Sequence, residues 1–239
     1  MAPSFAQSFL LLATTAALSN ATTLSGRQSV DPGIGVNPNA QGATAEVTPG
    51  SGPNGSEEWF NRGLTSGGWD PPFLDFDSLY HISRDQFYTG VGSACEKYDS
   101  YFQNASNIHN LNPVILAFIA MQESSCSASA GGPTPGLMQD NVNAGANYLR
   151  KRLDASNNNA LLAFGSYNGW FTANNRLNGS KGLTEDYPCS TEGKKNGQPQ
   201  NLDYLHQTLN GWFMGQDVYW NQRWIGTYGC SGQCDVNLC

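Results

Sequence analysis

The sequence predicts a mainly α domain, and three observations carry this prediction. Apolar residues recur at spacings of three and four along several segments, capping residues stand before two of these segments, and no long stretch alternates between apolar and polar residues. Residues 226–239 could hold a short hairpin, but nothing else reads as a strand. At 239 residues, the chain suits one domain with appendages.

The first expected helix begins at a capping box. In Ser83-Arg-Asp-Gln86, the Ser83 hydroxyl and the Gln86 amide can satisfy early backbone donors. One apolar face then continues at helical spacing through Phe87, Val91, Cys95, Tyr98 and Phe102. This spacing predicts a single amphipathic helix through the stretch.

The second expected helix, residues 113–124, is apolar on nearly every side. Asn112 provides a cap, and Pro113 suits the first helical position. Because a helix that is apolar all round is normally buried, we expect this one in the core. Glu123 stands near its C-terminal end, on the same helix face as Ile115 and Ile119.

Three further helices are expected downstream. The third is indicated by Val142, Ala146, Leu149 and Leu153. The fourth is indicated by Leu161, Phe164 and Tyr167 and ends near Gly169. The fifth starts with Leu202, Leu205 and Leu209, and it can continue to Trp224 with a break at Gly211.

The N-terminal residues resemble a secretory signal peptide, residues 1–21. Residues 9–18 form a short apolar stretch, too short to span a bilayer, and Ser19 and Ala21 are small residues placed for cleavage after Ala21. We therefore expect a secreted, extracellular protein without membrane association after cleavage. Residues 22–55 are rich in Gly, Pro, Asn, Ser and Thr and predict a flexible linker or propeptide. Residues 56–239 then form the folded domain.

The six cysteines all follow the predicted signal peptide, and an even number in a secreted chain suggests three disulfides. Fifteen pairings are possible. Cys95 and Cys126 fall at or near two predicted helices and could join them. Three triplets fit the N-glycosylation sequon and make the chain a candidate glycoprotein, at Asn54, Asn104 and Asn178.

The charge pattern restricts the partners. The formal net charge is -7, and charged residues make up only 13% of the chain. A basic face is missing, which argues against nucleic-acid binding. A neutral or cationic substrate meets no long-range repulsion from this chain, whereas an anionic polymer does.

Glu123 is a candidate general acid. A carboxyl group held against apolar side chains loses hydration in its charged form, so its pKa should rise. The partial negative charge at the helix C-terminus acts in the same direction. The alternative is that Glu123 turns outward and titrates normally, which its position alone would favour.

The downstream sequence resembles the transglycosylase SLT domain. Four segments occur in the order of that family: "ES" at 123–124, "GLMQ" at 136–139, "NVNAGANYL" at 141–149 and "YNGW" at 167–170. The SLT enzymes form glycoside hydrolase family 23 and are related to goose-type lysozymes. The sequence departs from the pattern at "YNGW", where the family has Y-N-A-G, and in a shorter loop between Glu123 and Gly136. The resemblance spans residues 111–169.

The resemblance implies a lysozyme-like helical fold with a glycan-binding cleft. It implies that Glu123 protonates the glycosidic oxygen of a β-1,4-linked N-acetylated glycan, and that the Tyr167 hydroxyl approaches this acid and the bound sugar. Cys126 follows the Glu123 segment directly, and from this position we expect it to tie the neighbouring loop to the scaffold through Cys95. Further cleft residues implied by the resemblance are Ser124, Met138, Gln139 and Asn168. For Met138 and Tyr167 core packing is the alternative, and for Gln139 and Asn168 it is backbone capping.

Asp140 is the candidate for a second carboxylate. Glycosidases usually use two carboxyl groups, one as acid and one as nucleophile or base. Bacterial members of the family use one glutamate and release a 1,6-anhydro product, while goose-type relatives place an aspartate just after "GLMQ". We expect hydrolysis assisted by Asp140, although Asp140 could equally cap the helix that begins near Asn141.

The substrate and the class of protein leave alternatives. Peptidoglycan is the family's default substrate, whereas neutral chitin or cationic chitosan suits the acidic chain better. A non-catalytic glycan-binding protein on the same scaffold is a further possibility. A cysteine protease built on Cys126 is disfavoured, because a disulfide explains this cysteine better. The three histidines lack zinc-ligand spacing. We expect a monomer without metal or cofactor.

Overall fold

The computed structural model describes residues 33–64, 68–129, 136–138, 141–174, 184, 201–218 and 225–226. Helices dominate these residues, and the two strands β1 (Ser51–Gly52) and β2 (Gly55–Ser56) form one small antiparallel hairpin. The predicted mainly α class is therefore confirmed. Among the described residues, no helix is long and apolar enough to cross a membrane. The predicted signal peptide and C-terminal hairpin lie outside the described residues.

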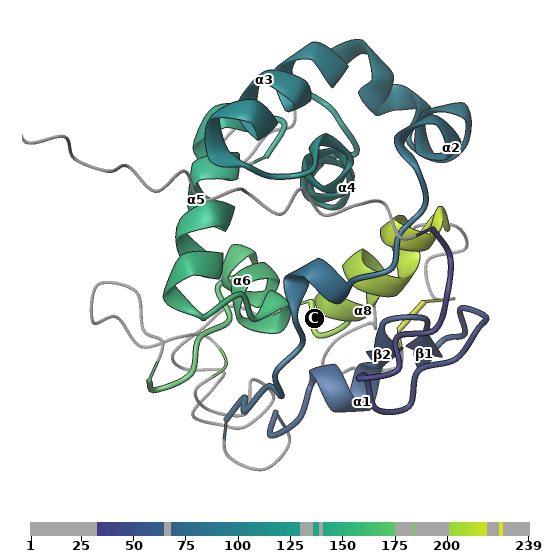
Figure 1. The fold of residues 1–239 in the computed structure, drawn as a ribbon, viewed down its shortest axis with the longest axis vertical. Coiled ribbons are helices and arrows are strands. Elements are labelled where there is room, and N and C mark those ends of the chain that lie inside the picture. The colour runs from purple at the N-terminus through teal and green to yellow at the C-terminus, as the bar shows by residue number, and fades with distance from the viewer. Residues whose placement is uncertain are drawn as a thin grey trace, which may run out of the picture.

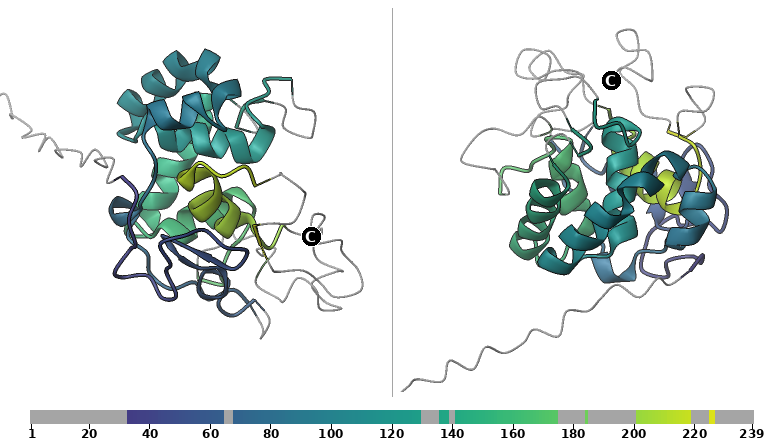
Figure 2. Two further views of the ribbon diagram at one scale, coloured as in Figure 1. Left: turned by 90° about the vertical axis from the view of Figure 1, so that its right-hand side faces the viewer. Right: turned by 90° about the horizontal axis from the view of Figure 1, so that it is seen from above.

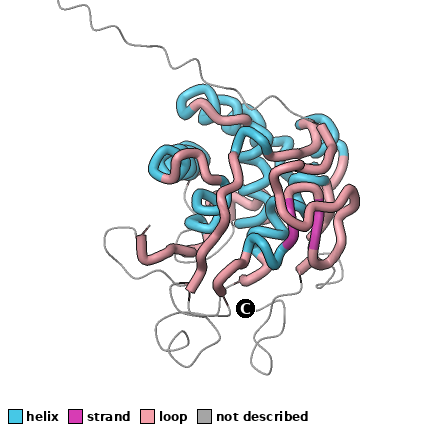
Figure 3. Tube along the Cα trace, turned by 60° about the horizontal axis from the view of Figure 1, so that its bottom comes forward, coloured by secondary structure: helices cyan, strands magenta, loops and turns pink. Residues whose placement is uncertain are grey.

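One buried helix, α4 (Pro113–Ser124), forms the centre of the molecule (Figure 1). Three helices pack against it: α2 (Arg84–Thr89), α3 (Asp99–His109) and α5 (Val142–Ala155). Below them lie the four-residue α1 (Glu57–Phe60), α6 (Ala160–Tyr167) and α8 (Tyr204–His206). Figure 2 shows the helices as one body from the side and from above, and Figure 3 shows the hairpin at the edge of this helical body.

The local sequence explains why α4 begins and ends where it does. The Asn112 side chain accepts from the backbone N–H of Val114, and Pro113 follows at the first helical position. Ser125 and Cys126 both take positive φ angles, 51° and 54°, so the helix ends at Ser124. Glu123 is thus held in the last turn.

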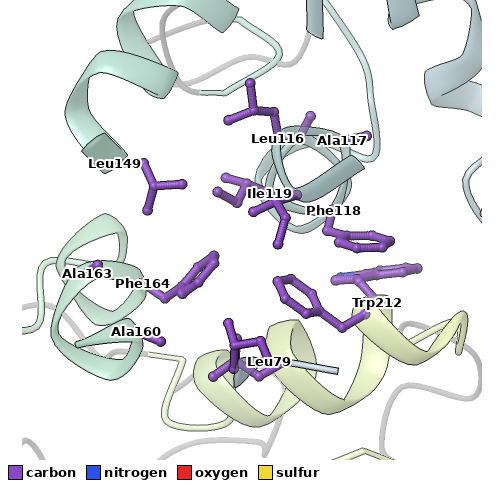
Figure 4. Packing of buried hydrophobic residues seen from close by; sticks show 14 of the residues in the cluster. Leu79, Leu116, Ala117, Phe118, Ile119, Leu149, Ala160, Ala163, Phe164 and Trp212 are labelled. Atoms are coloured by element: carbon purple, nitrogen blue, oxygen red, sulfur yellow. The ribbon is translucent and has the colours of Figure 1, made fainter. Parts of the chain in front are cut away.

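The core forms where α4 meets the aromatic residues of the later elements (Figure 4). Phe118 has no exposed surface, and its ring lies 4.7 Å from those of Phe87 and Phe213. Phe164 of α6 packs edge-to-face on Phe213 at 5.7 Å. The fully buried Trp212 lies in the same cluster. These contacts fix the C-terminal elements onto α4.

One helix prediction needs correction. The single helix expected from Ser83 is broken into α2, a 3₁₀ segment Ser93–Tyr98 and α3. Gly90 ends α2, and Gly92 lies against the Phe87 ring so closely that a Cβ would not fit. The fifth helix is expected to break at Gly211, and the helical type changes there: α8 passes into a π-helical turn, Gln207–Gly211, which is followed by a 3₁₀ turn, Trp212–Met214.

Residues 33–55 are packed against the helical body, whereas the sequence predicts a flexible linker over 22–55. Asn54 is fully buried: its Nδ2 donates to the carbonyl oxygens of Tyr80 (2.9 Å) and Leu209 (2.6 Å). Asn37 is 1% exposed and donates to the Ser78 carbonyl oxygen. A segment with few apolar residues is thus held by amide side chains, which leave no periodic pattern in the sequence.

The described cysteines form the disulfide that the sequence suggested. Cys95 and Cys126 are bonded, with Cα atoms 5.1 Å apart, and link the 3₁₀ segment before α3 to the end of α4. The other four cysteines lie outside the described residues. Of the sequons, Asn54 is buried and unsuited to carry a glycan in the folded protein, Asn104 is exposed on α3, and Asn178 lies outside the described residues.

Candidate functional site

Glu123 lies half-buried at the end of α4, and a tyrosine from a distant part of the chain contacts it. The Tyr204 hydroxyl donates to Oε1 of Glu123 at 2.5 Å. Tyr204 is only 3% exposed and is the first residue of α8. This distance is at the short end of the range for O–H···O hydrogen bonds. The hydrogen bond fixes the position of the Glu123 carboxyl group.

Sequence reasoning missed Tyr204. The two residues are 81 positions apart, and Tyr204 stands beside the periodic leucines 202, 205 and 209, where an aromatic residue reads as core.

Tyr167, expected to approach Glu123, donates its hydroxyl hydrogen bond to the Gly145 carbonyl oxygen. Burial raises the pKa of Tyr167 well above its usual value, and the nearby Glu123 carboxylate and Tyr148 raise it further. Tyr167 is therefore a neutral phenol close enough to Glu123 to sense its charge. Tyr148 packs edge-on against it, with ring centroids 5.2 Å apart.

Gly145 lets α5 approach this tyrosine. A Cβ on Gly145 would lie 3.0 Å from Met138 and 3.1 Å from the Tyr167 hydroxyl. Met138 is 2% exposed and therefore packs as a core residue beside Gly145. The glycine of the "NVNAGANYL" segment thus has a steric role.

Ser124 acts on the backbone. Its hydroxyl lies 2.8 Å from the Leu137 carbonyl oxygen and 3.0 Å from that of Ala120, and it accepts from the backbone N–H of Ser127 at 3.2 Å. These contacts tie residues 136–138 to the end of α4. The sequence-based role of Ser124 in substrate binding has no counterpart in these contacts.

Asn168 belongs to a chain of amide side chains that runs beside the site. It ends α6 and donates to the Asn201 carbonyl oxygen at 3.2 Å. The Asn201 side chain donates to Gln207 Oε1 at 2.8 Å, and Gln122, the residue before Glu123, approaches the same oxygen at 3.3 Å. Trp212 donates to Gln122 Oε1 at 2.7 Å. This series of hydrogen bonds links α4, α6 and the segment after α8.

His206 anchors α8 to the N-terminal segment. Its Nε2 lies 3.0 Å from the Thr48 carbonyl oxygen, so Nε2 carries the proton, and Nδ1 accepts from the Asn210 amide at 3.0 Å. Burial lowers the pKa of His206 to about 4, against the opposing effect of the Thr48 and Pro49 carbonyl groups. This neutral histidine holds the helix that supplies Tyr204.

Comparison with known proteins found no match. No family model, no curated protein and no solved structure is similar to the chain. What the site can do is therefore argued from its residues: one half-buried carboxyl group, oriented by a tyrosine and flanked by a second, neutral tyrosine.

Four sequence-based expectations remain: the roles of Gln139 and Asp140, the absence of a metal site and the role of Cys126. Gln139 and Asp140 lie outside the described residues. Within the described ranges, no cluster of three or more His, Cys, Asp or Glu side chains could hold a metal ion. Cys126 is bonded to Cys95, so it offers no thiol for a cysteine protease.

Proposed function

We propose that the protein is a secreted glycosidase that cleaves β-1,4 bonds of an N-acetylated cell-wall glycan, with peptidoglycan as the first candidate substrate. The observation that carries the proposal is the Tyr204–Glu123 hydrogen bond at the end of a buried helix. The four segments that resemble the SLT domain support it, because residues from all four gather there: Glu123, Met138, Gly145 and Tyr167.

In this proposal Glu123 donates a proton to the glycosidic oxygen. The sugar alkoxide is a poor leaving group, so proton transfer to it raises the rate of cleavage, typically by about 10²–10⁴-fold. Tyr204 holds the carboxyl group in one orientation, which general-acid catalysis requires. Tyr167 keeps its proton at mild pH and adds no competing negative charge beside the acid. A lysozyme-like fold with a sugar-binding cleft is part of the same proposal.

The second half of the reaction divides into two routes. We propose hydrolysis, with Asp140 assisting the attacking water. In the other route a hydroxyl of the sugar attacks, and the product is lighter by one water. Mass analysis of the products separates the routes, and Asp140→Asn with an unchanged hydrolytic rate would remove Asp140 from the mechanism.

Chitin is the second candidate substrate, because of the net charge. At -7 the chain repels anionic polymers at long range, whereas chitin is neutral and shares the β-1,4 linkage and the N-acetyl group. Partly deacetylated, cationic chitosan would also be tolerated.

The test is incubation of the protein with peptidoglycan and with chitin oligomers. Glu123→Gln, which preserves shape and an acceptor for Tyr204, is expected to abolish cleavage without loss of folding. Tyr204→Phe removes one hydrogen bond to a charged group, worth about 1.5–3 kcal/mol, so cleavage should fall roughly 10- to 100-fold. His109→Gln, a substitution at the half-buried last residue of α3, which contacts Asn143 and not Glu123, is the control and should cleave at the wild-type rate.

A wild type that binds either polymer but cleaves neither would instead show a non-catalytic glycan-binding protein. A Glu123→Gln variant that cleaves at the wild-type rate would remove Glu123 as the acid.

A further inference from the structure

One stripe along α3 carries two exposed apolar side chains. Tyr101 is 62% exposed and Ile108 is 59% exposed, although both side chains are large and hydrophobic. The helix lies at the surface of the molecule (Figure 1), and the face that it turns to the core holds Phe102, Ala105 and Ser106. Apolar surface that stays in water gives up the free energy that its burial would supply. The described residues leave this stripe uncovered.

Asn104 stands between these two side chains on the same stripe. At about 100° and 1.5 Å per residue, the three positions fall within about 60° of the helix circumference. Along the helix axis, Asn104 lies about 4.5 Å from Tyr101 and about 6 Å from Ile108. Asn104 is exposed and begins an N-glycosylation sequon, Asn104-Ala-Ser106. The Nδ2 of Asn54, in the other described sequon, instead donates to two carbonyl oxygens of the folded protein.

Ser106, which completes the triplet, is a second observation that points to modification. Its side chain is 3% exposed, and its hydroxyl has no hydrogen-bond partner among the described residues. A buried hydroxyl without a partner lowers stability, and alanine is the better helix former, so the fold gains nothing from serine here. An N-glycosylation acceptor, however, requires a Ser or Thr hydroxyl two residues after the asparagine. Recognition of the chain before it folds explains this serine, whereas the folded helix does not.

The chain also has the features of a protein that reaches the compartment where N-glycans are added. The Cys95–Cys126 disulfide is typical of the oxidising secretory pathway, and residues 1–21 predict entry into it. We propose that Asn104 carries an N-linked glycan whose first sugar rings pack on Tyr101 and Ile108. The C–H face of a sugar ring is apolar and suits an aromatic ring and an aliphatic side chain on either side of the attachment point.

The modification is a group transfer from a lipid-diphosphate-linked oligosaccharide, which the secretory pathway supplies. Nδ2 of Asn104 forms a bond to C1 of the first N-acetylglucosamine, and the bond between C1 and the diphosphate oxygen breaks. The lipid diphosphate leaves with the electron pair, and the proton that Nδ2 loses passes to the solvent. Glu123 takes no part in this step, so the proposal is independent of the proposed function.

The first test measures whether Asn104 is occupied in the full chain secreted from a eukaryotic host. An amidase that releases N-glycans leaves an aspartate at each modified position, and mass analysis of the peptides is expected to show that Asn104 was modified. Ser106→Ala should abolish the glycan, whereas Ser100→Ala, the same change at an exposed serine of α3 outside the triplet, should keep it. An unmodified Asn104, in a preparation whose host proteins do carry N-glycans, would overturn the proposal.

Melting temperatures separate the effect of the glycan from that of the serine. In protein from a host that adds no N-glycans, Ser106→Ala should melt at or above the temperature of the parent, because it removes an unpartnered hydroxyl. In secreted protein the same substitution should lower the melting temperature by about 2–4 °C, because the cover of the stripe is lost. An equal fall in both hosts would mean that the fold uses this hydroxyl, which would overturn the proposal.

A double-mutant comparison tests the contact with the sugar. Tyr101→Ala should lower the melting temperature more in the glycosylated protein than in the unglycosylated one. Phe73→Ala, at a 59% exposed aromatic residue next to the segment that contacts Asn159, is the matched control and should act equally in both. Equal effects of Tyr101→Ala in the two forms would show that the glycan does not cover the stripe. A dimer of the glycosylated protein that Tyr101→Ala dissociates would place a second copy there and would also overturn the proposal.

Discussion

Acid should unfold the protein through His206. The histidine is fully buried and neutral, and its pKa is lowered to about 4, compared with an ordinary 6.5. In the unfolded chain it takes up a proton as the pH falls through 6.5, while in the folded protein it resists until about pH 4. The contribution of neutral His206 to the free energy of unfolding is therefore complete above pH 6.5, and it is lost as the pH falls from 6.5 to 4.

The size of the effect follows from that difference in pKa. A difference of 2.5 between 6.5 and 4 corresponds to roughly 3 kcal/mol, at about 1.4 kcal/mol for each pKa unit. Since small domains are stable by only about 5–15 kcal/mol, this loss is a large part of the total. Most of it, about 2 kcal/mol, should already be gone at pH 5.

The assay is urea unfolding followed by tryptophan fluorescence at pH 7.5, 6, 5 and 4. Trp170 and Trp212 are fully buried, so their emission reports the loss of the core. His206→Gln removes the titrating group, and its free energy of unfolding should fall less between pH 7.5 and 4 than that of the wild type, by roughly 3 kcal/mol. His109→Gln, at the half-buried last residue of α3, is the control. If His206→Gln loses as much stability as the wild type over this range, the reasoning is wrong.

Three other predictions concern the frame of the site. Ser124→Ala should lower the free energy of unfolding by about 1 kcal/mol in urea titrations, because the hydrogen bond from the Ser124 hydroxyl to the Leu137 carbonyl oxygen is lost. Ser125→Ala is the control and should lower it far less; an equal loss in both variants would show that this hydrogen bond is not the cause. Gly145→Ala should lower the rate of cleavage as well as the melting temperature, since the new Cβ displaces Met138 and the Tyr167 hydroxyl from α5. Unchanged kinetics would show that the close approach of these two groups to α5 does not affect cleavage. Replacing Cys95 and Cys126 together with serine should destabilise the protein by roughly 3–4 kcal/mol, the chain-entropy value for a separation of 31 residues; a variant that melts at the temperature of the oxidised wild type would contradict this value.

The elements that could be predicted from the sequence are those whose signals are local. The cap at Asn112, the proline after it and the unbroken apolar run identified α4 and placed Glu123 in its last turn. The capping box at Ser83 is present as expected, with both of its hydrogen bonds formed. Such signals act within one turn of helix, so they need no knowledge of the rest of the chain.

The features that escaped prediction depend on residues far apart in the sequence. The partner of Glu123 comes from α8, and the order of residues around Tyr204 gives no hint of this contact. The break between α2 and α3 arises because the Phe87 ring occupies the space beside Gly92, a packing effect that apolar spacing does not show. Tyr167 satisfies its hydroxyl on the Gly145 carbonyl, an acceptor that only the packing of α6 against α5 supplies.

The packing of residues 33–55 changes how the site is understood. Thr48 supplies the carbonyl that fixes His206, and the Asn210 amide that holds the other ring nitrogen also donates to the Gly55 carbonyl. Two residues before His206, Tyr204 donates to Glu123. The segment with the composition of a linker is therefore the support of the helix that orients the carboxyl group. Its polarity has a physical reason, because buried backbone groups beside α8 need hydrogen-bond partners that apolar side chains cannot provide.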